Sequence, residues 1–391
     1  MSKKPNIRFK GFSDDWEQRK LGEVFKEYSE KNHTELPALT IIQGGGTVKR
    51  EESDRNLMYD ESNLSNYKMV QKDDFIVHLR SFEGGLEKSL LDGIISPAYH
   101  TFHSDVADSR FYYPYFRSHE FIKHKLVPHV YGIRDGRSID IAGMKTIEIP
   151  YTSIEEQRKI GDYLESLDHL ITLHRRKCDK LKELKKHMLK KMFPKNNEKF
   201  PEYRFDGYTD PWEQRKLGEL ALFNPKDELP QTFEYVDLES VVGTEMLSHR
   251  TEVKSSAPSR AQRLAHTGDL FYQTVRPYQK NNYLFEKPDN NYVFSTGYAQ
   301  MRPYVDGYFL LSLVQSERFV KVVLDNCTGT SYPAINANDL AEIEVAVPSD
   351  ESEAQKIGTI FRSIDHLITL HQRKVDNLKI FKKFMLKKMF V

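Results

Sequence analysis

Four short stretches combine arginine, amide, hydroxyl and aromatic side chains with glycine or proline, and such side chains are suited to binding DNA. Arginine can pair with two acceptors of guanine and glutamine or asparagine with adenine, while hydroxyls and glycine amides suit phosphates. The stretches lie at 78–85, 131–138, 273–282 and 328–332. Ordinary solvated turns are the alternative for each of them. The candidate DNA-contacting residues are Arg80, Ser81, Arg134, Arg137, Gln273, Arg276, Tyr278, Lys280, Asn282 and Tyr332.

Patterns that could support catalysis are weaker. Asp237, Glu252 and Lys254 match the loose carboxylate-and-lysine pattern of metal-dependent nucleases, a pattern that is common by chance. A stand-alone nuclease is therefore the enzymatic alternative. Gly44-Gly45-Gly46 lacks the Lys-Ser or Lys-Thr pair of a phosphate-binding loop, which favours a structural turn. We expect no catalytic residue and no metal site in this chain.

The four stretches are carried by a framework that occurs twice. Three blocks are identical in its two copies: 16–23 and 212–219, 168–174 and 365–371, and 188–193 and 385–390. Between these blocks the two halves show no evident similarity. A duplicated scaffold with two unlike inserts can hold two different readers in one geometry.

Comparison of the two copies also tests single motifs. His174 and Cys178 are one helical turn apart, as two ligands of a metal ion can be. Their counterparts in the second copy are His371 and Val375, and valine cannot bind a metal. Packing between helices is therefore the favoured role of Cys178.

Each copy of the framework ends in a heptad pattern that predicts a long helix. Ser153 and Glu156 form a capping box, so the first helix is expected to start there. Polar residues within the pattern, His174, His371, Lys185 and Lys382, are expected to specify register. The apolar residues of the predicted helix-pairing seam are Leu164, Leu167, Ile171, Cys178, Leu181 and Met188 in the first helix and Phe361, Ile364, Ile368, Val375, Leu378 and Met385 in the second.

Connectivity makes the two helices antiparallel if they pair along this seam, because the first leads to the second globular segment and the second leads back. The predicted fold class is α+β, with two β-rich globular domains joined by two long antiparallel coiled-coil helices in a pseudo-twofold internal repeat. The predicted domains are 1–152 and 194–348, and the helical segments are 153–193 and 349–391. Apolar runs at 75–77, 270–272 and 344–347 predict strands, and 112–127 and 307–324 predict helices.

Charge is distributed unevenly over the 391 residues, although the formal net charge is only +1. Segment 154–193 has eleven basic against seven acidic residues, and segment 349–391 has nine against five. The remainder of the chain is consequently acidic, so any nucleic-acid surface has to be a local patch.

Apolar runs and cysteines limit the class of protein. No run approaches the roughly 20 apolar residues of a membrane span, and no signal peptide is recognisable, so we expect a cytoplasmic protein without membrane contact. Two cysteines are too few for a disulfide framework or a four-ligand zinc site.

The arrangement as a whole resembles the specificity subunit of type I restriction-modification enzymes. Each variable segment follows a Trp-Glu-Gln-Arg-Lys-Leu-Gly-Glu block and is closed by a proline-led helix with Glu156 to Gly161 or Glu353 to Gly358. The resemblance implies a non-catalytic DNA reader with two target-recognition domains. Each domain would read one half of a bipartite, asymmetric site, and the helices would set the unread spacer.

The resemblance also implies partners and cofactors that this chain does not itself supply. Methyltransferase subunits would bring S-adenosylmethionine and dock near the repeated helices. ATP- and Mg²⁺-dependent restriction subunits would join them on double-stranded DNA. A coiled-coil adaptor without a role in DNA binding is the alternative outside both the reader and the enzyme classes.

Overall fold

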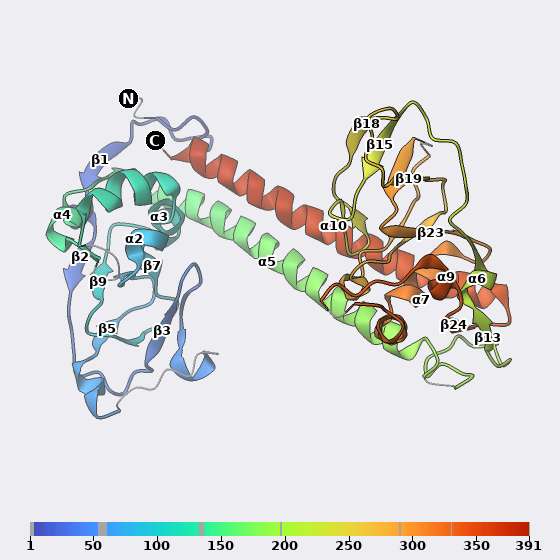
Figure 1. Cartoon of the computed structure of the whole chain (residues 1–391). Coiled ribbons are helices and arrows are strands. Elements are labelled where there is room, and N and C mark those ends of the chain that lie inside the picture. Colours follow the sequence, from blue (N-terminus) through green and yellow to red (C-terminus); the bar gives the residue numbers. More distant parts are fainter. Residues whose placement is uncertain are drawn as a thin grey trace. The chain divides into compact units, whose positions relative to one another are not determined.

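The computed structural model describes residues 4–53, 61–132, 137–195, 198–288, 291–329 and 331–390, and the chain divides into two compact units. Unit 1 comprises Met1–His174 and Arg373–Val391, and unit 2 comprises Arg175–Gln372. Each unit contains one β-rich domain and part of each of two long helices, α5 (Ile154–Lys191) and α10 (Glu351–Met389) (Figure 1). The predicted α+β class is confirmed.

The repeated Trp-Glu-Gln-Arg-Lys-Leu-Gly-Glu block forms the same substructure in both units. Its Glu-Gln-Arg-Lys part is a strand that pairs antiparallel with the last strand before the long helix, and a one-turn helix follows it. In unit 1 these elements are β1 (Glu17–Lys20), α1 (Leu21–Val24), α4 (Ile141–Lys145) and β12 (Glu148–Tyr151). In unit 2 they are β13 (Glu213–Lys216), α6 (Leu217–Leu220), α9 (Ala337–Ala341) and β24 (Glu344–Val347).

Both domains are built on a four-stranded antiparallel sheet of the same strand order, although their sequences are unlike. In unit 1 the order is β2 (Lys26–Tyr28), β9 (His100–His103), β6 (Phe75–Val77) and β7 (Glu87–Lys88). In unit 2 it is β14 (Ala221–Phe223), β23 (Tyr298–Pro303), β20 (Leu270–Gln273) and β21 (Tyr283–Leu284). The predicted strands at 75–77, 270–272 and 344–347 are therefore confirmed.

The remaining strands differ between the domains. Unit 1 adds three two-stranded pairs: β3 (Leu39–Ile42) with β4 (Gly46–Lys49), β5 (Lys68–Val70) with β8 (Gly93–Ile95), and β10 (Val130–Tyr131) with β11 (Ser138–Ile139). Unit 2 adds a second four-stranded sheet, β18 (Arg250–Val253), β15 (Thr232–Val236), β22 (Tyr292–Ser295) and β19 (Ala261–Leu264), and the pair β16 (Val241–Val242) with β17 (Glu245–Met246).

The two predicted domain helices are each divided into shorter elements. Over 112–127 the chain forms α3 (Ser109–Phe116) and then the π-helix η3 (Phe121–Leu126), followed by η4 (Val127–His129). Over 307–324 it forms α7 (Gly307–Gln315) and α8 (Glu317–Asp325). Ser316 separates the latter pair because its backbone is extended and its hydroxyl accepts a hydrogen bond from the Phe319 amide. The other short helical elements are η1 (Arg50–Glu52), η2 (Glu61–Asn66), α2 (Ser81–Gly84) and η6 (Pro277–Gln279).

Within each unit the segments of α5 and α10 pack against each other through the predicted seam. In unit 2, Cys178 lies against the Ile368 carbonyl and Lys185 Nζ lies 2.6 Å from Asp365, so the two segments run antiparallel. In unit 1 the equivalent pair is Lys382 and Asp168, with 2.6 Å between Nζ and Oδ2. All twelve apolar seam residues are buried or half-buried. Lys185 and Lys382 therefore each pair with a carboxylate at one position along the seam. Such a pair fixes how the two helices align, which is what a register-specifying residue does.

A buried carboxylate ties the start of each long helix to its own domain. Glu156 accepts hydrogen bonds from Arg8 Nε at 2.6 Å and Trp16 Nε1 at 3.0 Å, and also from Thr152. The predicted capping box is therefore only half formed: Ser153 Oγ accepts from the Glu156 amide, but the Glu156 side chain binds Arg8. In unit 2, Glu353 accepts two hydrogen bonds of 2.8 Å from Arg204.

Replacing Glu156 with glutamine should destabilise unit 1, because it leaves Arg8 partly buried beside a neutral group. Breaking a buried ion pair costs about 3 kcal/mol, which thermal unfolding followed by circular dichroism would measure. Glu155→Gln, on the exposed side of the same turn, is the matched control and should change stability by less than about 0.5 kcal/mol.

The pH dependence provides the second readout for this substitution. Burial alone would raise the pKa of Glu156, but the hydrogen bonds from Arg8, Thr152 and Trp16 outweigh it and lower the pKa below its ordinary value of 4.5. The ionised carboxylate thus adds stability above pH 4.5, which is lost as the pH falls towards the lowered pKa. The wild-type chain should lose stability in acid more steeply than Glu156→Gln, and parallel pH profiles would contradict this role.

Candidate nucleic-acid interface

In unit 2 the two candidate stretches form a single surface. The loop after β20 pairs with the loop before α9, through hydrogen bonds from the Arg276 amide to the Pro333 carbonyl at 2.8 Å and from the Ile335 amide to the Thr274 carbonyl at 3.1 Å. The Arg276 guanidinium lies 4.3 Å from the centre of the Tyr332 ring. Such a stack orients the guanidinium and leaves its hydrogen-bond donors free for a ligand.

The backbone of this loop is held in an unusual conformation. Arg276 has a φ of 54° and Lys280 a φ of 56°, on either side of the turn η6. The left-handed region costs a residue with a side chain about 1 to 2 kcal/mol, and such strain persists only where surrounding contacts impose it. Here Gln315 Nε2 donates to the Lys280 carbonyl at 2.9 Å. The loop is therefore built to hold one specific shape.

The six candidates of unit 2 divide into two groups. Gln273 and Asn282 are 2% and 1% exposed, and they bond to the loop itself: Gln273 Nε2 donates to Gln279, and Asn282 Oδ1 accepts from the Gln273 amide. Their amides position the loop and do not face solvent. Tyr278 and Tyr332 are 49% and 64% exposed, Arg276 is half-buried, and Lys280 pairs with Glu317 at 2.8 Å.

In unit 1 the corresponding loops also meet through an arginine on an aromatic ring. The Arg137 guanidinium lies 4.4 Å from the centre of the Phe82 ring and 3.5 Å from Glu83. Arg80 is exposed, whereas Ser81 is buried and its hydroxyl accepts a hydrogen bond from the His78 amide at 2.9 Å. Arg134 lies outside the described residues.

Sequence reasoning missed two features of the unit 1 loops. Phe82, the platform for Arg137, was not among the candidates, because the two residues are far apart in the sequence and no local pattern connects them. His78 is the second: burial, together with the positive charge of Arg117, lowers its pKa to about 4. The imidazole is therefore neutral near pH 7 and adds no charge to this surface.

The two surfaces occupy the same position in the fold. The first loop of each follows the third strand in the order of the four-stranded sheet, β6 or β20, and the second loop precedes α4 or α9. The residues differ, with Arg137 and Phe82 in one unit and Arg276 and Tyr332 in the other. The same scaffold therefore presents two different chemical surfaces.

The residues of the nuclease hypothesis do not form a metal site. Arg250 pairs with both carboxylates, at 2.7 Å from Asp237 and 2.8 Å from Glu252, while Lys254 lies 3.8 Å from Glu228. Burial alone would raise the pKa of Asp237, but hydrogen bonds from Ser240 and Arg250 outweigh it and lower the pKa. Among the described residues, no group of three or more His, Cys, Asp or Glu side chains is placed to hold a metal ion.

Gly44 and Gly45 lie in the turn between β3 and β4, as the sequence predicts, and Gly46 is the first residue of β4. The buried Glu87 carboxylate accepts hydrogen bonds from the amides of Gly44 at 2.7 Å and Gly46 at 3.3 Å. A protein carboxylate thus occupies the amides that a phosphate-binding loop would offer to a nucleotide.

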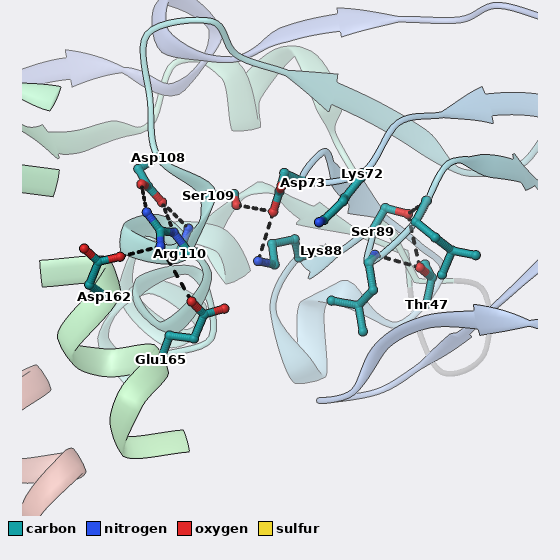
Figure 2. Close-up of polar contacts among 12 residues, drawn as sticks. Thr47, Lys72, Asp73, Lys88, Ser89, Asp108, Ser109, Arg110, Asp162 and Glu165 are labelled. Atoms are coloured by element: carbon teal, nitrogen blue, oxygen red, sulfur yellow. Dashed lines mark hydrogen bonds and ion pairs between the residues drawn. The ribbon is translucent and has the colours of Figure 1, made fainter. Parts of the chain in front are cut away.

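A hollow of about 560 Å³ in unit 1 is lined by four acidic side chains, Asp73, Asp105, Asp108 and Glu165, and four basic ones, Lys72, Lys88, Arg110 and Arg158, several of which are drawn in Figure 2. Lys88 lies 3.1 Å from Asp73, and Arg110 lies 2.7 Å from Asp108. Figure 2 shows Arg110 also facing Asp162 and Glu165 of α5. These contacts anchor α3 to α5 and leave little net charge for an anion.

None of the helices that the structure describes is long and apolar enough to cross a bilayer.

Comparisons with known proteins agree on one family. The family model described as "Type I restriction modification DNA specificity domain" matches residues 13–183 and again residues 209–379. Two curated proteins of Methanocaldococcus jannaschii are similar: the type I restriction enzyme MjaVIII specificity subunit, 24% identical over 264 residues, and the putative type I restriction enzyme MjaX specificity subunit, 23% identical over 257 residues. Each alignment covers 63% of this chain, which spans about three fifths of the length of these relatives (61% and 59%).

A solved structure shares the fold over the whole chain. The crystal structure of the type I restriction-modification system S subunit from M. genitalium superposes with a TM-score of 0.65, covers 99% of both chains and is 16% identical. At this identity the match shows the fold alone.

Replacing Arg276 with alanine should weaken binding of the purified chain to its DNA target. Loss of an arginine that contacts a base costs about 1 to 3 kcal/mol, so the dissociation constant should rise about 5- to 150-fold in a fluorescence anisotropy titration. Arg260→Ala removes an exposed arginine from the same unit and is the matched control, with affinity within about twofold of wild type. Equal losses in both variants would show that only overall charge matters.

Proposed function

Because the chain belongs to the family of type I restriction-modification DNA specificity proteins, we propose that it reads a bipartite DNA site, with one β-rich domain for each half. The observation that carries this proposal is that the two domains share a sheet order but present different residues from the same two loops. Recognition without catalysis is the role of this chain, and chemistry on the DNA belongs to its partner subunits.

The asymmetry of the site follows from the unlike loops. Arg137 lies beside Glu83 on Phe82, whereas Arg276, whose own backbone is left-handed, stacks on an exposed tyrosine. Surfaces with such different donors and acceptors cannot both select the same bases. The two half-sites therefore differ in sequence, unlike the palindromes that identical readers select.

The long helices support a fixed spacer between the half-sites. Both α5 and α10 contribute residues to both compact units, and within each unit they are locked by an equivalent lysine–aspartate pair. A helix pair with a specified register has a defined length, which sets the number of unread base pairs.

Partner subunits have a surface available on the same helices. Several large apolar side chains outside the seam are exposed, which favours protein docking over solvent. In unit 1 they include Leu170, Leu173, Phe381 and Phe384, and in unit 2 Leu184, Leu367 and Leu370. Methyltransferase subunits carrying S-adenosylmethionine dock here, and restriction subunits that use ATP and Mg²⁺ complete the complex. Because the complex acts on DNA, we place it in the cytoplasm.

Selection of duplexes from a random pool tests the function directly. With its methyltransferase partner, the chain should enrich two short, different sequence blocks separated by a constant unread spacer. Arg276→Ala should relax one block and Arg137→Ala the other. Relaxation of both blocks by one substitution would exclude independent readers, and the absence of any enriched sequence would favour the coiled-coil adaptor.

Insertion of one heptad into each long helix, after Arg175 and after Gln372, tests the spacer. Seven residues lengthen a helix by about 10 Å, or about three base pairs, so the selected spacer should grow by about three while both blocks stay the same. Insertion into α5 alone is the control: it shifts Lys185 away from Asp365 and should lower the melting temperature. An unchanged spacer in the doubly extended chain would refute the idea.

A further inference from the structure

Unit 2 contains a second basic feature, which shares Lys280 with the recognition loop. A hollow of about 640 Å³ lies between the C-terminal part of α5, the start of α8 and Lys280. Leu189, Phe193 and Pro194 supply its apolar lining. We call it the basic hollow, because seven cations line it: Lys182, Lys185, Lys186, Lys190, Lys195, Lys280 and Arg318.

Acidic partners neutralise only some of these cations. Lys185 pairs with Asp365, Lys195 with Glu202, and Lys280 with Glu317. In the part of the chain that the structure describes, Lys182, Lys186, Lys190 and Arg318 form no ion pair. Four unmatched charges of one sign around one hollow repel each other, and a polyanion would relieve that repulsion. The hollow of unit 1 in Figure 2 is different, because its lining has four acidic and four basic side chains.

The three unmatched lysines form a line. Lys182, Lys186 and Lys190 are four residues apart, so they lie on one face of α5 with about 6 Å between successive positions. Long lysine side chains at this spacing can reach successive phosphates of one DNA strand, whose charges recur every 3.4 Å along the axis.

The internal repeat supplies an independent observation. The positions equivalent to the three lysines in α10 are Lys379, Lys383 and Lys387, all lysine again. Neighbouring exposed positions are not kept: Glu183 corresponds to Ile380 and His187 to Phe384. The three lysines thus belong to the part of the chain that is repeated. This is expected of a contact to the DNA backbone, because the backbone is the same in every sequence.

The basic hollow is continuous with the recognition loop. Lys280 lines it and stands four residues after Arg276, and Gln315, another lining residue, fixes the Lys280 backbone through its hydrogen bond. A DNA strand contacted by Arg276 and Tyr332 therefore has a basic surface beside it on α5.

We propose that Lys182, Lys186 and Lys190, with Arg318, form a track for the DNA phosphate backbone, so that the helix holds spacer DNA next to the half-site read by unit 2. The track rests on the proposed function as a DNA reader. It adds affinity without sequence preference, because phosphates are the same in every sequence. An acidic segment of a partner protein is the competing occupant of the hollow.

The test compares two triple variants of the full chain. Lys182→Gln/Lys186→Gln/Lys190→Gln removes the track, and Arg175→Gln/Lys177→Gln/Lys180→Gln removes three exposed cations of α5 that do not line the hollow. The probes are a 40-base-pair duplex with the selected site and a scrambled duplex of the same length. Fluorescence anisotropy is measured over a range of salt concentrations.

The track variant should bind both duplexes at least about tenfold more weakly, and the slope of log K against log salt should fall by about 2.7, or 0.9 for each lost contact. Its preference for the selected duplex should stay unchanged. The control triple should stay near wild type, and Lys182→Arg/Lys186→Arg/Lys190→Arg should restore binding. Equal melting temperatures show that folding is not the cause.

The other outcomes separate the two proposals. If the wild-type chain prefers the selected duplex but the track variant has an unchanged salt slope, the track is overturned and the function as a DNA reader is kept. Loss of methyltransferase-subunit binding by that variant, with DNA binding intact, assigns the hollow to an acidic protein segment. If the variant binds more weakly but the wild-type chain shows no sequence preference, the track is kept and the function as a DNA reader is rejected. Absence of wild-type binding to either duplex rejects both.

Discussion

Glu156 and Glu353 each lie at the start of a long helix, almost fully buried, and each accepts two hydrogen bonds from an arginine near the beginning of its repeat. A carboxylate in such a position is stable only while the guanidinium faces it. The pair therefore fixes where each helix leaves its domain, and with it the β1–β12 and β13–β24 pairings beside it. Everything that the helices position depends on these two contacts.

The repeat is similar but not identical at this contact. In unit 1 Trp16 donates its indole N–H to Glu156, whereas the buried Trp212 indole N–H has no partner among the described residues of unit 2. The lysine–aspartate pairs of the seam, in contrast, are present in both units. The two copies thus share the interactions that specify helix register, and they differ by one hydrogen bond to a carboxylate that an arginine neutralises in both.

The proposed DNA-reading loops lie where the two copies differ in sequence. The four-stranded sheets have the same order, so the loops after β6 and β20 start from equivalent places. What those loops offer is decided by few side chains, Arg137 on Phe82 and Arg276 on Tyr332. One frame therefore carries two different surfaces, and Phe82, the platform of one of them, also belongs to the hydrophobic core of unit 1.

The sequence by itself determined the features that depend on local pattern: the repeated blocks, the long helices and their seam, the strands at 75–77, 270–272 and 344–347, and the resemblance that identified the family. Heptads, caps and alternating apolar runs act over a few residues, so they can be recognised without the fold. Only the tertiary structure decided that Ser316 divides one predicted helix, and that Gln273 and Asn282 face inward. It also brought Arg276 onto Tyr332 and joined the lysines of α5 to Lys280 in one hollow. These arrangements connect residues distant in the chain, and packing of the whole core selects them, not the preferences of any short segment.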